Sequence, residues 1–296
     1  MGLTQQERTA AARSSLDGLS VGDAFGDRFF LLANRDLSRE SGLPPAPWRW
    51  TDDSEMACSV YDVLNRRGGI DQDELARCFA ERFDIGRQYG VGALELLERV
   101  RRGDHWHRAS RESFDGRGSY GNGAAMRVAP LGAYFADDLP RAAREAELQA
   151  EITHAHPEGI AGAIAVALAA AHLASVRDVE PAAVIDVVMG HLSVGEYVRR
   201  GLERARGLLA ASPAEAAREL GNGSRISAQD TVPFALWVAV THLDDYEAAV
   251  RACVQVGGDM DTTAAIIGGL IAAHRGRDAI PDGWLEAREP LPAFIG

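Results

Sequence analysis

The sequence predicts an all-α protein, a compact orthogonal bundle of roughly a dozen or more helices. Apolar residues recur with helical spacing along nearly all of the 296 residues. No sustained run alternates β-branched and polar residues, as a half-buried strand would. No linker or low-complexity segment interrupts the pattern, so we expect residues 1–296 to form a single domain.

The expected helices are stretches of apolar periodicity separated by short segments rich in Gly, Asp and Pro. In chain order they cover residues 4–20, 54–66, 71–82, 90–102, 124–134, 140–151, 158–175, 181–189, 194–210, 213–220, 230–243, 246–256 and 262–275. Two long loop-rich regions remain, residues 31–49 and 103–123, and a smaller one of the same kind covers residues 221–228. Loops this long inside a compact domain are often functional.

Capping residues mark the first three helices. The capping box Thr4-x-x-Glu7 starts the first helix, and Asp53 and Asp71 are each able to cap the next two. The glycine-rich segment 22–26 is expected to close the first helix, because glycine tolerates tight turns. In the second loop-rich region, His105-Trp106-His107 is expected to be loop with one anchored aromatic side chain.

Small residues dominate two later helices. Pro157 stands where a first-turn proline is tolerated, just before an Ala-rich run from Ile160 to Ala174. That run and residues 264–273 suit close packing at the centre of an α-domain. The run is about 15 residues long, short of a bilayer span, so we expect no membrane segment.

Composition narrows the classes of partner. The net charge of −12 argues against an extended nucleic-acid surface but leaves room for one nucleotide-like ligand. The three cysteines, Cys58, Cys78 and Cys253, are too few and too odd in number for a disulfide framework. The first 15 residues lack the apolar run of a signal peptide. We therefore expect a cytoplasmic protein with buried, reduced thiols.

Two acidic triads carry the strongest chemical signal. Thr51-Asp52-Asp53 and Asp259-Met260-Asp261-Thr262 stand about two hundred residues apart, each opening an apolar helix. Asp or Thr at such a place can be a simple N-cap, yet capping accounts for one acidic residue per helix, not two. Carboxylates with a threonine hydroxyl are the hard oxygen ligands that Mg²⁺ or Mn²⁺ prefers. If the fold joins the triads, four carboxylates need cations to neutralise them. The sequence therefore predicts a two-metal hydrolase site.

Weaker signals surround these triads. The glycine-rich loop Gly118-Ser119-Tyr120-Gly121-Asn122-Gly123 enters the helix expected from residue 124, so its amides and that helix start can hold an anionic diphosphate. Arg127 on that helix is interpreted as an internal salt-bridge partner. His154 is either structural or in contact with the ligand. Asp23 is either a metal ligand or a hydrogen-bond partner behind one, and the second reading is favoured.

Five segments resemble the ADP-ribosylglycohydrolase family in order. They are GLSVGDAFG (18–26), WTDDSEMA (50–57), SYGNGAAMRVAPLG (119–132), ITHAHPEGIAGA (152–163) and VGGDMDTTAAIIGG (256–269). Any one is a modest match, whereas five in the family's order form a specific one. The resemblance covers most of the chain and implies an all-α fold.

The resemblance also implies a site. It implies two Mg²⁺ (or Mn²⁺) ions held at the positions of Thr51, Asp52, Asp53, Asp259, Asp261 and Thr262. It further implies that the 118–123 loop contacts the diphosphate of ADP-ribose and that His154 lies beside the ligand. The expected reaction is hydrolysis of the glycosidic bond at C1″ of ADP-ribose linked to a protein side chain or small acceptor. Asp261 is our candidate to bridge the metals and Asp53 to orient the attacking water.

One departure from the family pattern bears on activity. Phe30 stands where many members carry a Glu that approaches the scissile bond, and Glu55 or Asp27 are candidates to replace that Glu. Phe30 is expected to contact the ligand, closing the pocket over an apolar or aromatic acceptor. Met260 and Thr263 also depart from the usual residues, with less consequence. The alternatives are an inactive ADP-ribose-binding relative, a structural protein, and a hydrolase of phosphate esters. Oligomeric state stays open.

Overall fold

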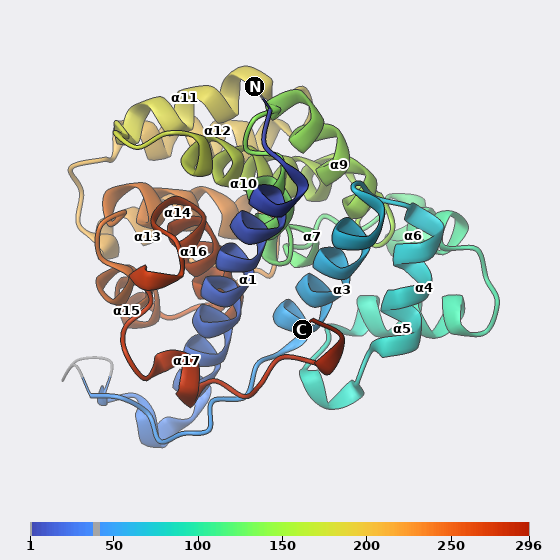
Figure 1. Ribbon diagram of the computed structural model, residues 1–296, viewed down its shortest axis with the longest axis horizontal. Helices are drawn as coiled ribbons and strands as arrows, with labels where there is room; N and C mark the ends of the chain where they lie inside the picture. The colour runs from blue at the N-terminus through green and yellow to red at the C-terminus, as the bar shows by residue number, and fades with distance from the viewer. Residues whose placement is uncertain (1, 38–41, 296) are drawn as a thin grey trace.

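Helices make up all the regular structure. The computed structural model describes residues 2–37 and 42–295, and within those residues no β-strand is present. Only two isolated bridges occur there, between Trp48 and Arg288 and between Gly121 and Ser227. The prediction of an all-α fold is confirmed, and Figure 1 shows helices crossing at many angles.

The helix bounds follow the predicted stretches closely in most places. The longer helices are α1 (Gln5–Asp27), α3 (Asp52–Arg67), α4 (Gln72–Arg82), α5 (Val91–Arg101), α6 (Trp106–Gly116), α9 (Leu139–Glu151), α10 (Pro157–Ser175), α11 (Pro181–His191), α12 (Glu196–Gly207), α13 (Pro213–Leu220), α14 (Ala228–Thr241), α15 (Tyr246–Val256) and α16 (Met260–Arg275). The short ones are α7 (Gly123–Met126), α8 (Ala129–Tyr134) and α17 (Trp284–Ala287), with 3₁₀ turns at Arg28–Phe30, Leu32–Asn34, Ile85–Arg87, Arg277–Ala279 and Ala293–Ile295.

α1 and α16 pack against each other along a line of small residues (Figure 1). A Cβ atom added at Gly22 would lie 2.1 Å from the Ala264 carbonyl oxygen, and one at Gly26 would lie 2.4 Å from the Met260 carbonyl oxygen. The two backbones therefore touch where any larger side chain would hold them apart. This contact sets the C-terminal end of α1 beside the first turn of α16.

α10 is a second central helix of the core, beside the α1–α16 pair. It is 19 residues long, longer than the expected run, and by length and composition alone it is apolar enough to cross a membrane. Yet 78% of its most apolar window is buried inside the protein. Its Ala-rich surface lets α8, α9, α14 and α16 approach closely, as expected for a core helix.

Three expectations about elements were wrong. Segment 22–26 does not close the first helix, which continues to Asp27, and its glycines lie inside the helix where it contacts α16. Residues 103–123 are not all loop: α6 lies there, with few apolar positions beyond the buried Trp106 and Ala109 to signal it. The helix predicted over 124–134 is divided into α7 and α8 around Arg127.

Candidate active site

The fold brings the two acidic triads together at the starts of α3 and α16. Thr51 is the N-cap of α3 and Asp259 is the N-cap of α16. The Thr262 hydroxyl on α16 donates to Asp53 Oδ2 on α3 across 3.5 Å. The expectation that Asp53 caps α3 was wrong, because the Thr51 side chain accepts from the Asp53 amide instead. At the start of each helix, two carboxylates are therefore not used to cap the helix.

Asp23 on α1 fixes the start of α3. Its carboxylate is fully buried and accepts hydrogen bonds from the Thr51 amide (3.0 Å), the Thr51 hydroxyl (2.9 Å), the Ser54 amide (3.1 Å) and the Ser54 hydroxyl (2.5 Å). Asp23 is therefore a hydrogen-bond partner behind the triad, the reading favoured from sequence. The Thr51 hydroxyl also lies within donor distance of Asp53 Oδ2, at 2.8 Å, so it links Asp23 to the first carboxylates of α3.

The acidic cluster consists of Asp52, Asp53, Asp259 and Asp261. Burial and mutual repulsion destabilise the ionised form of these carboxyl groups. Burial, followed by the charge of Asp23, raises the pKa of Asp52 to about 8. Burial and then neighbouring carboxylates raise the pKa of Asp53 and of Asp261 well above its usual value. Burial likewise raises the pKa of Asp259. So many carboxyl groups cannot all be ionised at neutral pH without positive charge between them.

The oxygen atoms present fit a hard divalent cation. Asp53 Oδ1 and Asp261 Oδ1 are buried and accept no hydrogen bond, so each keeps lone pairs for another partner. The nearby donors are all oxygen, as Mg²⁺ and Mn²⁺ require. Within the described residues, no three His, Cys, Asp or Glu side chains already stand close enough to hold a metal ion. The carboxylates as they stand therefore leave such a ligand set open.

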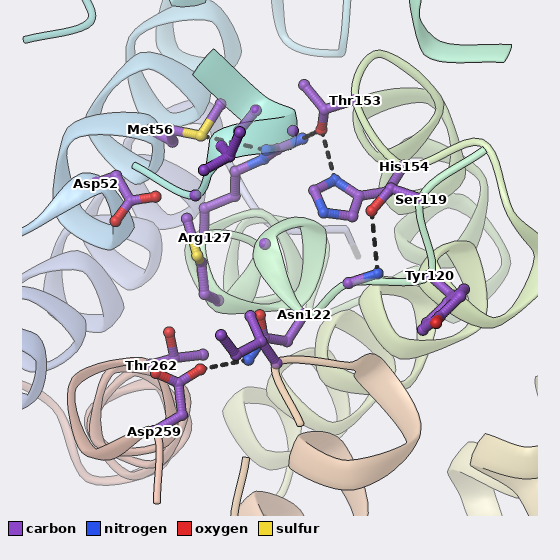
Figure 2. Close-up of a pocket in the computed structure, with 18 of the residues that line it drawn as sticks. Asp52, Met56, Ser119, Tyr120, Asn122, Arg127, Thr153, His154, Asp259 and Thr262 are labelled. Carbon is purple, nitrogen blue, oxygen red and sulfur yellow. Dashed lines mark hydrogen bonds between the residues drawn. The ribbon is translucent and has the colours of Figure 1, made fainter. Parts of the chain in front are cut away.

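A cavity of about 410 Å³ opens beside this cluster. Its walls come from the starts of α3, α5 and α16, the kinked end of α6, the glycine-rich loop and the loop before α14. The lining residues are Asp52, Met56, Gln88, Gly90, Val91, Gly92, Ala93, Ser113, Phe114, Ser119, Tyr120, Gly121, Asn122, Gly123, Met126, Arg127, Thr153, His154, Arg225, Ile226, Asp259, Asp261 and Thr262. Figure 2 shows Asp52, Asp259 and Thr262 on one side of this cavity, with His154 and Tyr120 on the other.

Four of the residues predicted for the site lie outside this lining. Thr51 and Asp53 are 1% exposed and stand directly behind Asp52. Gly118 is buried where a Cβ would lie 2.7 Å from the His156 amide nitrogen, so it shapes the loop. Phe30 is 43% exposed on the 3₁₀ turn after α1 and does not line the cavity. Its contact with a ligand stays a prediction.

The glycine-rich loop is tied to the acidic cluster. The Asn122 amide donates to Asp259 Oδ2 at 2.6 Å and to Thr231 Oγ1 at 3.0 Å. The helix that follows is only the four-residue α7, so the positive helix start expected there is weak. The longer α5 supplies one instead: its N-cap Gly90 has no side-chain cap, and the first turn lines the cavity.

His154 forms the floor beneath this loop. Its Nδ1 lies 2.7 Å from the Thr153 hydroxyl oxygen. Burial, and then the charge of Arg127, lowers the pKa of His154 to about 3, so the ring is neutral at physiological pH. A Cβ at Gly121 would lie 3.1 Å from His154 Nε2. Glycine there lets the loop backbone rest directly on the imidazole.

Arg127 is not the salt-bridge partner expected from sequence. Its guanidinium donates to Gln149 Oε1 (2.8 Å) and Thr153 Oγ1 (2.9 Å) and stacks over Phe79, 4.6 Å from the ring centroid. None of the carboxylates in the described residues forms an ion pair with it. Burial lowers the pKa of Arg127 to about 9. Arg127 is a buried cation whose hydrogen bonds hold the segment that carries His154 in place.

The two candidates to replace a missing catalytic Glu differ in access. Glu55 is 8% exposed, and its Oε2 accepts from the Tyr89 hydroxyl at 2.7 Å and the Asp84 amide at 3.0 Å. Asp27 Oδ1 accepts from the side chain of Gln88 at 2.7 Å, and Gln88 lines the cavity. Asp27 is therefore the one with a direct link to the cavity wall.

Sequence reasoning missed part of the lining. Phe114, Arg225 and Ile226 lie in the loop-rich regions 103–123 and 221–228 but carry no motif of their own, and α6, which holds Phe114, was itself not predicted. A usable signal did exist for the start of α5: Gly90 is its N-cap, Val91 and Gly92 form its first turn, and no side chain caps it. An uncapped helix start rich in glycine is a common anion site.

Comparisons with known proteins find relatives along most of the chain. A family model described as ADP-ribosylglycohydrolase matches residues 4–293. The ADP-ribosylhydrolase ARH3 of Gallus gallus is 30% identical over 275 residues, covering 81% of this chain and 74% of that protein. The ADP-ribosylarginine hydrolase Tri1 of Serratia proteamaculans (strain 568) is 25% identical, covering 96% and 76%. A solved structure titled ADP-ribosylglycohydrolase-related protein complex aligns with a TM-score of 0.67 at 25% identity, covering 96% and 94%.

Proposed function

The chain belongs to the ADP-ribosylglycohydrolase family, and from that premise we propose that it is a hydrolase dependent on two Mg²⁺ or Mn²⁺ ions. Its reaction is cleavage of the glycosidic bond at C1″ of ADP-ribose linked to a protein side chain or small acceptor. The observation that carries this proposal is the meeting of both acidic triads at one side of a cavity whose opposite wall is the glycine-rich loop. The ADP-ribosylhydrolases among the relatives support it.

The polarity of the cavity sets the direction of the ligand. The acidic side, with Asp52 and Asp259, takes the ribose that carries the acceptor. Loop 119–123 and the start of α5 offer amide groups to the diphosphate. Beyond them the exposed rings of Phe114 and Tyr120, with centroids 6.4 Å apart, suit the flat faces of adenine. ADP-ribose thus runs from the buried carboxylates to the exposed rim.

Hydrolysis replaces the bond between C1″ and the acceptor by a bond between C1″ and a water oxygen, and the acceptor leaves with a proton. Bound divalent cations supply positive charge that neutralises the carboxylates and polarises oxygen atoms beside them. Our candidate to orient the attacking water is Asp53, whose Oδ1 has no other partner. Asp261, with its unpartnered Oδ1 on the facing helix, is our candidate to bridge the cations. Neutral His154 contacts the ligand without adding charge.

A catalytically impaired ADP-ribose-binding protein is the second candidate function. The observation that favours it is the turn after α1, where Phe30 is exposed and carries no carboxylate toward the cavity. Binding needs only the loop, the rim and the cations, whereas turnover also needs a proton for the leaving acceptor. Asp27, linked through Gln88, is the carboxylate that could supply it.

Calorimetric titration of ADP-ribose distinguishes these possibilities from an unrelated ligand. The metal-stripped protein and the Mg²⁺- and Mn²⁺-loaded protein are titrated in parallel, and arginine-, serine- and base-linked ADP-ribosyl substrates are then assayed. Metal-dependent binding with release of ADP-ribose supports the hydrolase. Metal-dependent binding without turnover of any substrate supports the binding protein. No binding with either metal overturns the ADP-ribose assignment.

A further inference from the structure

The peptide unit that leads into the first acidic triad is held on both of its edges. The Thr51 amide donates to Asp23 Oδ2 at 3.0 Å. The Trp50 carbonyl, on the opposite edge of the same peptide plane, accepts from Arg87 Nη1 at 2.9 Å. Because that plane is rigid, the two bonds together fix the direction in which the chain enters α3.

Two further contacts fix the guanidinium of Arg87. It forms a bidentate pair with Glu289, in which Nη1 lies 2.8 Å from Oε2 and Nη2 lies 2.9 Å from Oε1. It also stacks on the Trp50 ring, 3.3 Å from the ring centroid. Arg87 is only 9% exposed, so water competes little for its donors. The Trp50 carbonyl therefore has a donor whose orientation is set in advance.

Glu289 belongs to the C-terminal segment, which pairs with the residues before α3. The Trp48 amide donates to the Ala287 carbonyl at 2.6 Å, and the Glu289 amide donates to the Trp48 carbonyl at 2.8 Å. None of these residues lines the cavity, and neither does Arg87. The C-terminal segment is thus connected through Glu289 and Arg87 to the entrance of α3 from outside the cavity.

We propose that Arg87 is a positioning residue for the cation site, acting through the Trp50–Thr51 peptide on the carboxylates at the start of α3. This inference rests on the proposed function, which assigns those carboxylates to bound Mg²⁺ or Mn²⁺. Arg87 and Asp23 hold opposite edges of the peptide, so it cannot turn when the carboxylates repel one another. Mg²⁺ demands near-ideal ligand geometry, and a small rotation of this peptide should therefore weaken its binding.

Calorimetric titration of Mg²⁺ into metal-stripped protein tests this role. The variant Arg87→Met removes every donor and keeps an apolar stem. The matched control is Arg8→Met, because Arg8 likewise donates to a carboxylate, that of Asp137 at 2.7 Å, and to a backbone carbonyl, that of Tyr134 at 3.0 Å. The Arg8 side chain is 17% exposed, against 10% for Arg87, and it lies at the end of α1 opposite Asp23. We expect Mg²⁺ to bind Arg87→Met about tenfold more weakly than the wild type and to bind Arg8→Met with wild-type affinity.

Urea unfolding without Mg²⁺ separates positioning from stability. Both Met variants should lose stability, because each breaks a largely buried ion pair, so only the Mg²⁺ affinity distinguishes them. Arg87→Lys keeps the charge without the planar fork, so it should have an intermediate affinity, and it provides a second variant if Arg87→Met does not fold. Wild-type Mg²⁺ affinity in either Arg87 variant, or an equal loss in Arg8→Met, overturns the role of Arg87. Failure of the wild type to bind Mg²⁺ overturns the proposed function, and this inference with it.

Discussion

The inner end of the cavity is built from helix starts, whereas its outer rim is built from turns. At the inner end, Asp53 and Asp261 stand in the first turns of α3 and α16, are at most 9% exposed, and are positioned by helix packing. At the rim, Phe114, Tyr120 and Ile226 are 45–65% exposed on short irregular segments. The buried end is suited to chemistry that needs a fixed geometry, and the exposed end to recognition.

Backbone strain follows the same division. Four residues other than glycine have positive φ in the described parts of the chain: Gln88, Phe114, Asp115 and Ile226. Three of them line the cavity, and Asp115 is the neighbour of Phe114. The inner end shows none of this strain and is stressed by like charge instead. The rim is therefore strained in its backbone conformation, whereas the inner end is destabilised by repulsion between like charges.

Of the substitutions considered, Asp261→Asn at the inner end should have the largest effect on activity. Loss of one carboxylate oxygen and one charge should reduce turnover by on the order of 10³-fold and abolish stabilisation by Mg²⁺. In metal-free protein the same change should raise the melting temperature by about 2–4 °C, because it relieves repulsion among buried carboxylates. Hydrolysis assays and thermal melts with and without Mg²⁺ measure both effects. Wild-type activity in this variant would remove Asp261 from the site.

Asp23→Asn should weaken the inner end less. One carboxylate oxygen becomes an NH₂ group that cannot accept, so α3 loses either the Thr51 hydroxyl bond to Oδ1 or the Ser54 bonds to Oδ2. We expect about 10- to 100-fold weaker Mg²⁺ binding, as is usual when a group that orients a ligand is removed. The control is Asp186→Asn, which alters an exposed ion pair with Arg206. Equal Mg²⁺ affinity in the two variants would show that α3 holds its position without Asp23.

The inner end could be predicted from sequence better than the rim, and the reason is physical. Triads such as Thr51-Asp52-Asp53 combine a local capping pattern with surplus charge, so their chemistry is visible in a few adjacent residues. Their meeting depends on the packing of α1 against α16, which the glycines signal only as turns. Gly22 and Gly26 were accordingly interpreted as the end of a helix, although they lie inside it.

At the rim, the glycine-rich loop signals Tyr120, but Phe114 and Ile226 carry no such local signal. Phe114 lines the cavity because the end of α6 leaves helical geometry at residues 113–115. Asp115-Gly116 signals a turn there but does not indicate where the ring lies. Ile226 occupies a conformation that its residue type disfavours, held by the hydrogen bond from its amide to the Gly223 carbonyl and by pairing with the loop around Tyr120. Such positions are set by tertiary contacts that override local preference, so sequence pattern cannot identify them.

Tyr120→Ala tests whether the rim binds the adenine of the ligand. If the ring stacks on adenine, its loss should weaken ADP-ribose binding about tenfold, since stacking of a base on an aromatic ring contributes about 1–3 kcal/mol. Mg²⁺ stabilisation of the ligand-free protein should be unchanged, because the acidic cluster is untouched. Tyr197→Ala, which removes a 60% exposed ring away from the cavity lining, is the control. Equal affinities for ADP-ribose would assign the base to another surface.

His154 lies between the two ends, and its removal should have the smallest effect. Its pKa is lowered to about 3 by burial, whereas in the unfolded chain it returns to about 6.5. The unfolded chain therefore binds the extra proton as pH falls through 6.5, and the folded state loses stability towards acid. At pH 6 this one group should cost the wild type about 1 kcal/mol relative to its stability at pH 8.

The variant His154→Gln removes the titration and keeps a neutral polar side chain. Urea unfolding of both proteins at pH 8, 7 and 6 isolates the histidine, because carboxylates that titrate in both cancel in the difference. We expect the stability gap between wild type and variant to shift towards the variant as pH falls. A gap that stays constant would mean that the imidazole protonates in the folded protein. A charged His154 would then join Arg127 in drawing the diphosphate toward the floor of the cavity, and binding rather than stability would carry the pH dependence.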